Sequence, residues 1–415
     1  MAIPGVTTLI RDRFYSVSRS NTPAGPRIVV IAKRDTADNA GNVSDLDIVQ
    51  ATTEKDVITA FGEGSDLHKA FLELISAGAE RIYMVPLPAT SSFDHTNGYV
   101  TATGYTADAM LDAAYAAAET VLPDIIVPWG RGGNSDDWED PATPGDTEYG
   151  FHADNSTTYS NSWVYKVAAR TKSIAENIHP CISILGVKPY DSGTKQVMTP
   201  AAVATHLGLS ALVSRGVSSL KDYGPYVCVI ATEIKPISYG TNGGTDYGYA
   251  NGACAMAASL SKMAAYSSVT AKPLYNVQAL RYAPTRTQQE ALANKGVNSV
   301  VLNFNKIAVF GDGLTFAASG SDYSRLSTKR VVDEAANVVR QACQKFVGEP
   351  STIQMRTSME TSISAALRGM QLLGALLASD FNVTYVPAEN KAIVDLIITP
   401  AFELKSIQVQ IAVNI

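Results

Sequence analysis

Few side chains of this 415-residue sequence are spaced for covalent or metal chemistry. The histidines lie far apart along the chain, and the cysteines form no C-x-x-C pair of the kind that binds zinc or carries redox chemistry. The histidines are at positions 68, 95, 152, 179 and 206, and the cysteines are at 181, 228, 254 and 343. We therefore expect no metal, no cofactor and no catalytic residues, and four reduced cysteines buried as small apolar side chains.

Motifs that bind phosphate or present a nucleophile are also missing from the sequence. It contains no G-x-x-x-x-G-K-[ST] loop, no G-x-S-x-G elbow and no H-E-x-x-H helix. Gly62-Glu63-Gly64 begins like a dinucleotide-binding turn, but it lacks the third glycine and is expected to lead into a helix. The alternative is a hydrolase-like α/β enzyme whose site would lie in loops at the carboxyl edge of a sheet. His179 and Asp191 are scattered candidates for the catalytic residues of such a site.

Residues 132–165 form an acidic stretch that contains no Lys or Arg. Its acids are Asp136, Asp137, Glu139, Asp140, Asp146, Glu148 and Asp154. Several carboxylates on one loop could bind Ca²⁺, but their spacing does not match an EF-hand, so a solvated inserted loop is the expectation. The aromatic residues Trp138, Tyr149, Phe151 and Tyr159 also allow a carbohydrate- or receptor-binding role for this loop.

The overall charge is mildly acidic and the proportion of charged residues is low. Thirty-three Lys and Arg against 39 Asp and Glu give a net charge of −6, which argues against a nucleic-acid-binding protein. Only 17% of residues are charged, against about 25% in an average soluble domain, as expected where much of the surface lies in interfaces. The first residues do not resemble a signal peptide, and no apolar run of about 18 residues indicates a membrane span.

Apolar runs alternate with amphipathic segments through the first two thirds of the chain. Residues 27–32 form an uninterrupted apolar run, typical of a strand buried on both faces, and helix 65–77 is followed directly by strand 81–86. The same order recurs as helix 107–121 and strand 124–128, helix 163–177 and strand 181–185, a helix opened by Thr199-Pro200 and strand 226–230, and a further helix 249–265. This order predicts a mostly parallel α/β sheet domain over 27–272, with 132–165 as an inserted loop, preceded by an extended arm over 1–26.

The alternation stops after residue 272, and an α+β domain is expected over 273–415. Its first part is a short helix 288–295, followed by strands within 299–316 that a hairpin-type turn at Gly311-Asp312-Gly313 would close. The later elements expected are two long helices, 328–346 and 359–379, and strands 382–386, 392–399 and 406–415.

The last ten residues, 406–415, alternate apolar and non-apolar side chains without interruption. This pattern predicts a strand with one buried face, and no proline or charge protects its edge. It could pair within its own domain with 392–399, or it could add to a sheet of a neighbouring subunit. The N-terminal arm could act in the same way, and the residues leave these two arrangements open.

Several short motifs occur in an order and spacing that match one protein family. They are Ile3-Pro4-Gly5-Val6 at the start, Phe61-Gly62 through Val85, Leu292 through Asn298, Phe346-Val347-Gly348-Glu349-Pro350, Leu367 through Leu376, and Ile397 through Pro400 with Ile407-Gln408-Val409. In these features the sequence resembles contractile tail sheath proteins of phages and, more loosely, the sheaths of R-type pyocins and type VI secretion systems.

The resemblance implies a structural and non-enzymatic role. A sheath subunit polymerises as stacked hexameric rings around the tail tube, and the sheath contracts to drive the tube through the host envelope. The implied partners are other copies of the chain, the tail tube protein, and the baseplate and tail terminator proteins, without nucleic acid and without direct membrane insertion. The implied location is the tail sheath of a myovirus-type virion that is assembled in the host cytoplasm.

Two sets of residues are expected to make these contacts. The strand-exchange set is Ile3, Val6 and Leu9 in the N-terminal arm and Ile407, Val409, Ile411 and Val413 in the last strand. The tube-contact set is Lys329, Arg330, Arg340, Lys345 and Arg368, on the two long helices. Arg340, Lys345 and Arg356 could form a basic face toward an acidic partner, although a cation at a helix C-terminus explains Lys345 equally well.

Overall fold

The structure is a computed structural model of the 415-residue chain. It describes residues 25–34, 43–88, 92–94, 98–100, 107–128, 163–186, 223–239, 248–250, 252–281, 283–294, 296–318, 320–389, 391–401 and 403. Four sequence predictions fall wholly or mostly outside these residues. They are the N-terminal arm before residue 25, the acidic loop up to residue 162, the helix opened by Thr199-Pro200, and the terminal strand 406–415.

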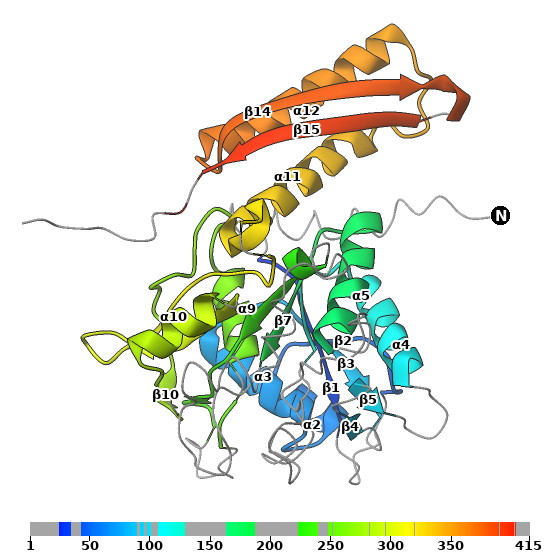
Figure 1. Ribbon diagram of the computed structural model, residues 1–415. Coiled ribbons are helices and arrows are strands. Elements are labelled where there is room, and N and C mark those ends of the chain that lie inside the picture. Colours follow the sequence, from blue (N-terminus) through cyan, green and yellow to red (C-terminus); the bar gives the residue numbers. More distant parts are fainter. Residues whose placement is uncertain are drawn as a thin grey trace, which may run out of the picture.

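A seven-stranded sheet in the order β11-β8-β7-β6-β1-β3-β2 forms the centre of the α/β body (Figure 1). Its parallel strands are β1 (Ile28–Lys33), β3 (Ile82–Leu87), β6 (Ile125–Pro128), β7 (Ile182–Gly186), β8 (Val227–Ile230) and β11 (Val297–Asn298). The edge strand β2 (Val49–Ala51) pairs antiparallel with β3. The mostly parallel α/β sheet expected from the alternation of elements is confirmed.

The continuous apolar run of β1 is explained by helices on both faces of the sheet. Ile28 and Val30 contribute to one core, and Val29 and Ile31 contribute to the other, since successive side chains of a strand point to opposite faces. The first core is covered by α2 (Glu54–Phe61), α3 (Asp66–Ala77) and α9 (Ala253–Ser261), and the second by α4 (Ala107–Glu119) and α5 (Trp163–Asn177). Neither face of the central strands is left for solvent.

Local capping explains why α3 begins and ends where the sequence predicts. The Ser65 hydroxyl accepts a hydrogen bond from the backbone N–H of His68 at 3.1 Å, which caps the first turn. Gly78 follows the helix with a φ of 84°, in the left-handed region that favours glycine after a helix. The N–H of Gly78 bonds to the carbonyl of Ile75, which closes the last turn.

The main sheet takes its last strand, β11, from beyond residue 272. This strand follows α10 (Arg286–Asn294), and Leu292, Val297 and Phe316 pack in the same core as α4 and α5. The pair β9 (Ile234–Pro236) and β10 (Val277–Leu280) also crosses residue 272. The domain division at 272 stays a prediction. Among the described residues, Leu326 at the start of α11 still belongs to a core of the α/β body, whereas the residues of α11 from Val331 onward belong to a separate core.

The hairpin-type turn expected at Gly311-Asp312-Gly313 was placed wrongly. The hairpin consists of β12 (Val300–Leu302) and β13 (Ala308–Phe310), so its turn covers residues 303–307 and lies before the glycines. The Asn303 side-chain oxygen accepts the backbone N–H groups of Asn305 and Ile307, each at 2.9 Å. An asparagine side chain can organise a turn in this way without any glycine.

A second unit, the C-terminal unit, is built from α11 (Leu326–Gln344), α12 (Ile353–Leu372), β14 (Leu376–Val386) and β15 (Lys391–Pro400) (Figure 1). One face of the β14–β15 hairpin packs on the helices and shares their core. The second helix was expected over 359–379 but begins and ends earlier. Thr352 caps its start, and Gly374, with a φ of 76°, terminates it before the strand begins at Leu376.

The remaining described elements are short. They are the hairpin β4 (Ser92–Asp94) and β5 (Gly98–Val100), and the single-turn helices η2 (Gly224–Tyr226), η3 (Asp322–Ser324) and η4 (Pro387–Glu389).

Candidate functional site: a polar junction and an open hairpin

Arg330 of α11 fastens the C-terminal unit to the end of α9. Its guanidinium donates to the backbone carbonyls of Leu260 at 3.0 Å, Met263 at 2.8 Å and Ala264 at 3.3 Å. Carbonyls at a helix C-terminus have no partner within the helix and favour a cation. Burial lowers the pKa of Arg330 to about 10, so the side chain stays charged at neutral pH.

Arg340, two to three turns further along α11, makes the same kind of contact with α5. It donates to the carbonyls of Glu176 at 2.9 Å and Ile178 at 3.4 Å, at the end of that helix. The two arginines therefore attach α11 to two different helices on opposite faces of the main sheet. These polar contacts define the position of the C-terminal unit on the α/β body.

Lys329 is also engaged within the chain. It forms an ion pair with Asp333, lies 4.6 Å from the ring centre of Tyr226, and is only 5% exposed. Three of the five residues of the predicted tube-contact set thus have partners within the chain, and Arg340, Lys345 and Arg368 are exposed. Contact with a tube stays a prediction for all five.

The basic face suggested by Arg340, Lys345 and Arg356 is likewise partly used within the C-terminal unit. The Arg356 guanidinium lies 4.3 Å from the ring centre of Tyr385, and it donates to the Ser351 hydroxyl at 3.0 Å. Lys345 lies 5.0 Å from the ring centre of Phe346.

Asp124 binds the backbone just before β1. Its Oδ2 accepts the backbone N–H of Arg27 at 2.7 Å, and its Oδ1 lies 2.9 Å from Nε2 of His179. Burial by itself would raise the pKa of Asp124, but the hydrogen bond and charge of His179 and the bond from Arg27 outweigh it, so this pKa is lowered. Asp333 and Glu334 of α11 also interact electrostatically with His179, and burial raises the pKa of each of these two carboxyl groups.

The Asp124–His179 pair lies on the wrong side of the sheet for the enzyme alternative. Both residues directly precede parallel strands, β6 and β7, so they lie at the amino edge, whereas α/β enzymes bind ligands at the carboxyl edge. Asp191 lies outside the described residues. The sequence contained a signal for this pair, since each residue stands just before a buried apolar run, but it was not recognised.

Glu403, which follows β15, connects the end of the C-terminal unit to Thr270 and to the start of α11. Its Oε1 accepts a hydrogen bond from the Thr270 hydroxyl at 2.6 Å, and its Oε2 accepts one from the Ser327 hydroxyl at 3.2 Å. Ser327 belongs to the first turn of α11. At the other end of the chain, Gly25 lies beside the Ser261 carbonyl, next to the end of α9 that Arg330 binds. Both terminal segments therefore start from the junction around the first turns of α11.

The β14–β15 hairpin is long and open. Its register runs from Leu376 opposite Pro400 to Val386 opposite Lys391, and neither strand pairs with a third strand among the residues described. Its outer face exposes Leu377 and Ile397, with Ile397 70% exposed. Unpaired strand edges are templates for pairing with another chain. The strand-exchange residues Ile3, Val6, Leu9, Ile407, Val409, Ile411 and Val413 lie outside the described residues, so their roles stay predictions.

The described part of the chain lacks two other kinds of feature, a metal site and a membrane-spanning helix. No group of three or more His, Cys, Asp and Glu side chains there could hold a metal ion. No helix in that part is both long and apolar enough to cross a bilayer.

The polar junction gives a pH-dependent prediction for Asp124. Its folded pKa is lowered, so its ionised form stabilises the fold above the unfolded pKa of about 3.9, and this contribution is lost as the pH falls through the folded pKa. We expect Asp124→Asn to reduce the free energy of unfolding at pH 7 by about 1–3 kcal/mol. The difference from the unmodified chain should shrink below about pH 4, measured by urea denaturation over a pH series. A constant difference from pH 7 to pH 3 would contradict this assignment.

Comparison with known proteins places the fold. No protein-family model and no curated protein matches the sequence. Among solved structures, a chain of the contracted anti-feeding prophage baseplate is similar over 99% of this chain and 98% of its own, with 13% identity and a TM-score of 0.64. A chain of the contracted PVC sheath complex, from an extracellular contractile injection system, matches over 95% and 92%, with 11% identity and a TM-score of 0.60.

A crystal structure from a bacterial source extends the similarity. The sheath tail protein of Listeria innocua matches over 94% of this chain and 95% of its own, with 11% identity and a TM-score of 0.55. Nearly the whole chain is covered in each comparison, so the α/β body and the C-terminal unit are both part of the shared architecture. The chain has the fold of the sheath proteins of contractile tails and injection systems.

Proposed function

We propose that this chain is the structural subunit of a contractile tail sheath. One observation carries the proposal: a full-length sheath-protein fold presents a β14–β15 hairpin that is unpaired at both edges among the described residues. Such a hairpin is suited to accept strands from neighbouring copies. The two segments that would supply those strands both start at the junction around α11.

The lengths of the elements support strand exchange. The predicted terminal strand 406–415 and β15 each have ten residues, so the strand can pair along the whole edge. The twelve residues after Glu403 span at most about 40 Å when extended, and the 24 residues before Gly25 span at most about 80 Å. These lengths set the greatest distance at which either segment could pair with the hairpin of an adjacent subunit.

In this proposal, subunits contact one another head to tail in hexameric rings that stack helically around a tail tube. Contacts of this kind generate rings and helices, whereas isologous contacts generate closed dimers. On contraction the subunits move as rigid bodies while the exchanged strands keep them connected. The larger buried surface of the contracted lattice supplies the free energy that drives the tube through the host envelope.

The partners follow from this role. They are further copies of the chain, the tail tube protein, and baseplate and tail terminator proteins, in the tail of a virion assembled in the host cytoplasm. Lys345, Arg368 and Arg340 are the exposed members of the predicted tube-contact set, and Arg340 also bonds to the end of α5. In the described part of the chain, the Asp124–His179 pair does not support the enzyme alternative, because it serves the junction at the amino edge of the sheet.

Electron microscopy tests the proposed function. We expect the purified full-length chain, negatively stained at high concentration, to form hollow tubes with six-fold end views. Without an inner tube, the contracted lattice is the expected form. Only monomers or dimers, both alone and with a purified baseplate to nucleate assembly, would contradict the proposal.

A further inference from the structure

A projecting apolar tip, formed by the β12–β13 turn and the residue beside it, stands out on the α/β body. Phe304 at the turn is fully exposed, and Leu302 and Ile307 on either side of it are about half exposed. Tyr275, 69% exposed, comes after Leu274, whose backbone N–H bonds to the Ala308 carbonyl, so the backbone of Tyr275 lies beside the turn end of β13. A monomeric protein gains nothing from presenting a phenyl ring and two aliphatic side chains together to water.

The tip is held rigidly. The Asn303 side chain accepts two backbone N–H groups, and the Asn303 backbone bonds to Ile307 and Lys306, each bond being 2.9 Å long. Lys306 adopts a left-handed φ of 58°, which completes the turn. A preorganised aromatic anchor loses little conformational entropy on binding, which is the property of an interface hot spot.

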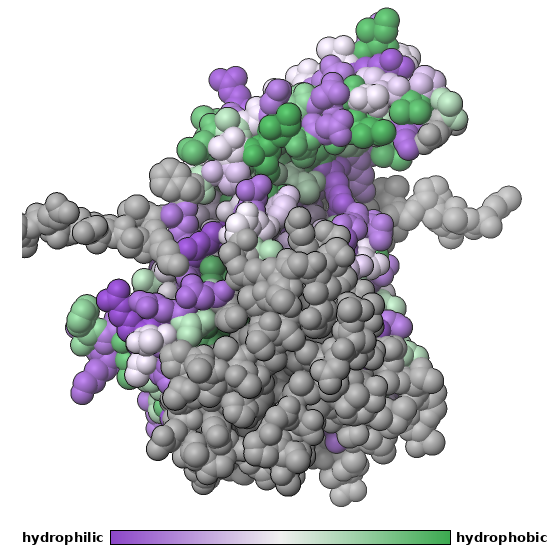
Figure 2. Space-filling view, in the orientation of Figure 1, coloured by the Kyte–Doolittle hydropathy of each residue, from purple (hydrophilic) through white to green (hydrophobic). Residues whose placement is uncertain are grey.

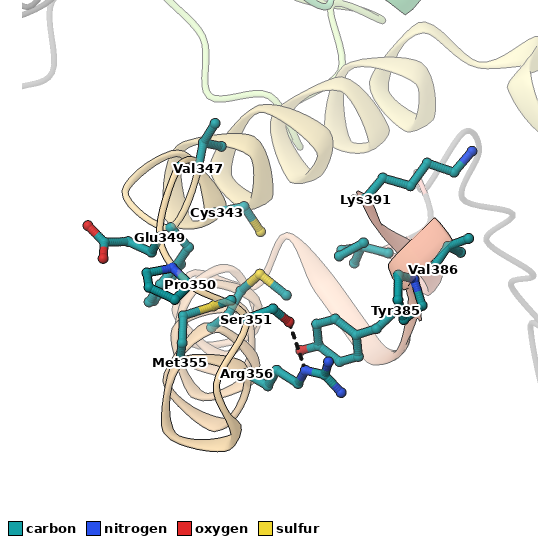
Figure 3. A pocket seen from close by; sticks show the side chains of 16 residues that line it. Cys343, Val347, Glu349, Pro350, Ser351, Met355, Arg356, Tyr385, Val386 and Lys391 are labelled. Atoms are coloured by element: carbon teal, nitrogen blue, oxygen red, sulfur yellow. Dashed lines mark hydrogen bonds between the residues drawn. The ribbon is translucent and has the colours of Figure 1, made fainter. Parts of the chain in front are cut away.

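The same chain carries an apolar groove at the far end of the C-terminal unit. The groove encloses about 600 Å³ between the α11–α12 turn and the tip of the β14–β15 hairpin (Figure 3). Phe346, Val347, Met355, Met359 and Val394 form its apolar lining. Figure 3 shows the Cys343 and Tyr385 side chains entering the groove from opposite sides.

We propose that the Phe304 tip of one copy docks in this groove of a neighbouring copy. The proposal rests on the proposed function, because it supplies a second contact between subunits beside strand exchange. The groove is large enough for a phenyl ring with its flanking aliphatic groups. Its charged lining residues are Glu349, Arg356 and Lys391; Arg356 is engaged by Tyr385 and Ser351, and the exposed Glu349 carboxylate complements Lys306 on the tip.

The positions of the two surfaces make the contact head to tail. In Figure 1, α10 and β10, which neighbour the tip in the chain, lie at the left of the α/β body, whereas the α11–α12 turn lies at the opposite end of the view. In Figure 2, hydrophobic residues are visible both on the C-terminal unit and at the left edge of the body. A surface that fits a different surface of the next copy produces a ring or a helix.

Substitution at the tip is the first test. Phe304→Ser removes only a solvent-exposed ring, so we expect unchanged thermal unfolding but at least a tenfold rise in the concentration needed for tube formation. Leu372→Ser is the matched control, since Leu372 is an exposed apolar residue at the end of α12, outside both the tip and the groove, and it should polymerise normally. Val347→Asp, at the groove, should reproduce the Phe304→Ser defect.

Cross-linking identifies the partner surface. The native thiol of Cys343 lines the groove, so N305C, which keeps Phe304 and lies next to it in the exposed turn, should be joined to it between copies by a short bis-maleimide, producing a ladder on a denaturing gel. The double variant N305C/C343S and the control L372C should produce no such ladder. Cross-linking of N305C to added tail tube protein in place of a second copy would overturn the choice of occupant.

The outcomes separate this inference from the proposed function. If the unmodified chain forms tubes, Phe304→Ser forms them equally well, and N305C gives no ladder, the docking proposal is wrong and the sheath proposal stands. If the unmodified chain forms no tubes, sedimentation at high concentration still decides. Self-association that is lost in Phe304→Ser supports the contact, and its absence in the unmodified chain overturns it.

Discussion

Replacing Arg330 by alanine is expected to lower the free energy of unfolding by about 3 kcal/mol. The guanidinium makes three charge-assisted hydrogen bonds to carbonyls at the end of α9. A hydrogen bond to a charged group contributes about 1.5–3 kcal/mol. The carbonyls of Leu260 and Ala264 keep backbone N–H donors from Met263 and Ser267, so the loss is expected to be smaller than three such bonds. Urea denaturation of the full chain at pH 7 measures the loss.

Matched variants distinguish the hydrogen bonds of Arg330 from a general effect of removing a positive charge. Arg368→Ala removes an exposed cation from α12 and should change the stability by less than about 0.5 kcal/mol. Arg330→Lys should recover only part of the loss, because one ammonium group cannot reach three carbonyls in the geometry of a planar guanidinium. Equal stability of Arg330→Ala and Arg368→Ala would show that Arg330 does not hold the C-terminal unit on the body.

Removing residues 407–415 is expected to abolish tube formation while leaving the described fold intact. Among the described residues, which end at Glu403, the α/β body and the C-terminal unit each have their own apolar core. The truncated chain should therefore show the circular dichroism and the unfolding midpoint of the full chain. Electron microscopy and sedimentation of the polymer provide the measurement.

A single substitution in the same strand gives a finer test. Val409→Asp places a carboxylate on the face expected to be buried against the neighbouring sheet, where an unpaired charge costs several kcal/mol. Gln408→Asp introduces the same charge on the opposite face and should leave assembly intact, since successive side chains alternate across a strand. Normal tubes from Val409→Asp would show that this face is not buried between subunits.

The junction has a consequence for how the proposed sheath would move. Arg330 and Arg340 connect α11 to the ends of α9 and α5, while Asp124 and Glu403 hold the roots of the two terminal segments. The C-terminal unit is thus fixed to the body at several separate points. In the proposed contraction, movement would then be concentrated in the terminal segments beyond those roots.

The sequence by itself determined the elements and their layers. The uninterrupted apolar run of β1 required helices on both faces, and Ser65 and Gly78 marked the ends of α3. The two long helices and the paired strands after them were also evident from their periodicity, although α12 begins six residues earlier, at 353 where 359 was expected. These features are local, because hydrophobic spacing and caps act within a few residues.

Only the tertiary structure decided what the cations of α11 do. Lys329, Arg330 and Arg340 have the composition of a surface that meets a partner, yet they bind Asp333 and the carbonyls of α9 and α5. A backbone carbonyl is present in every residue, so a side chain that binds one has no partner visible in the sequence. The two-residue strand β11 and the Asn303 turn were missed for a similar reason: each depends on contacts between distant segments or on one side chain folding back on its own backbone.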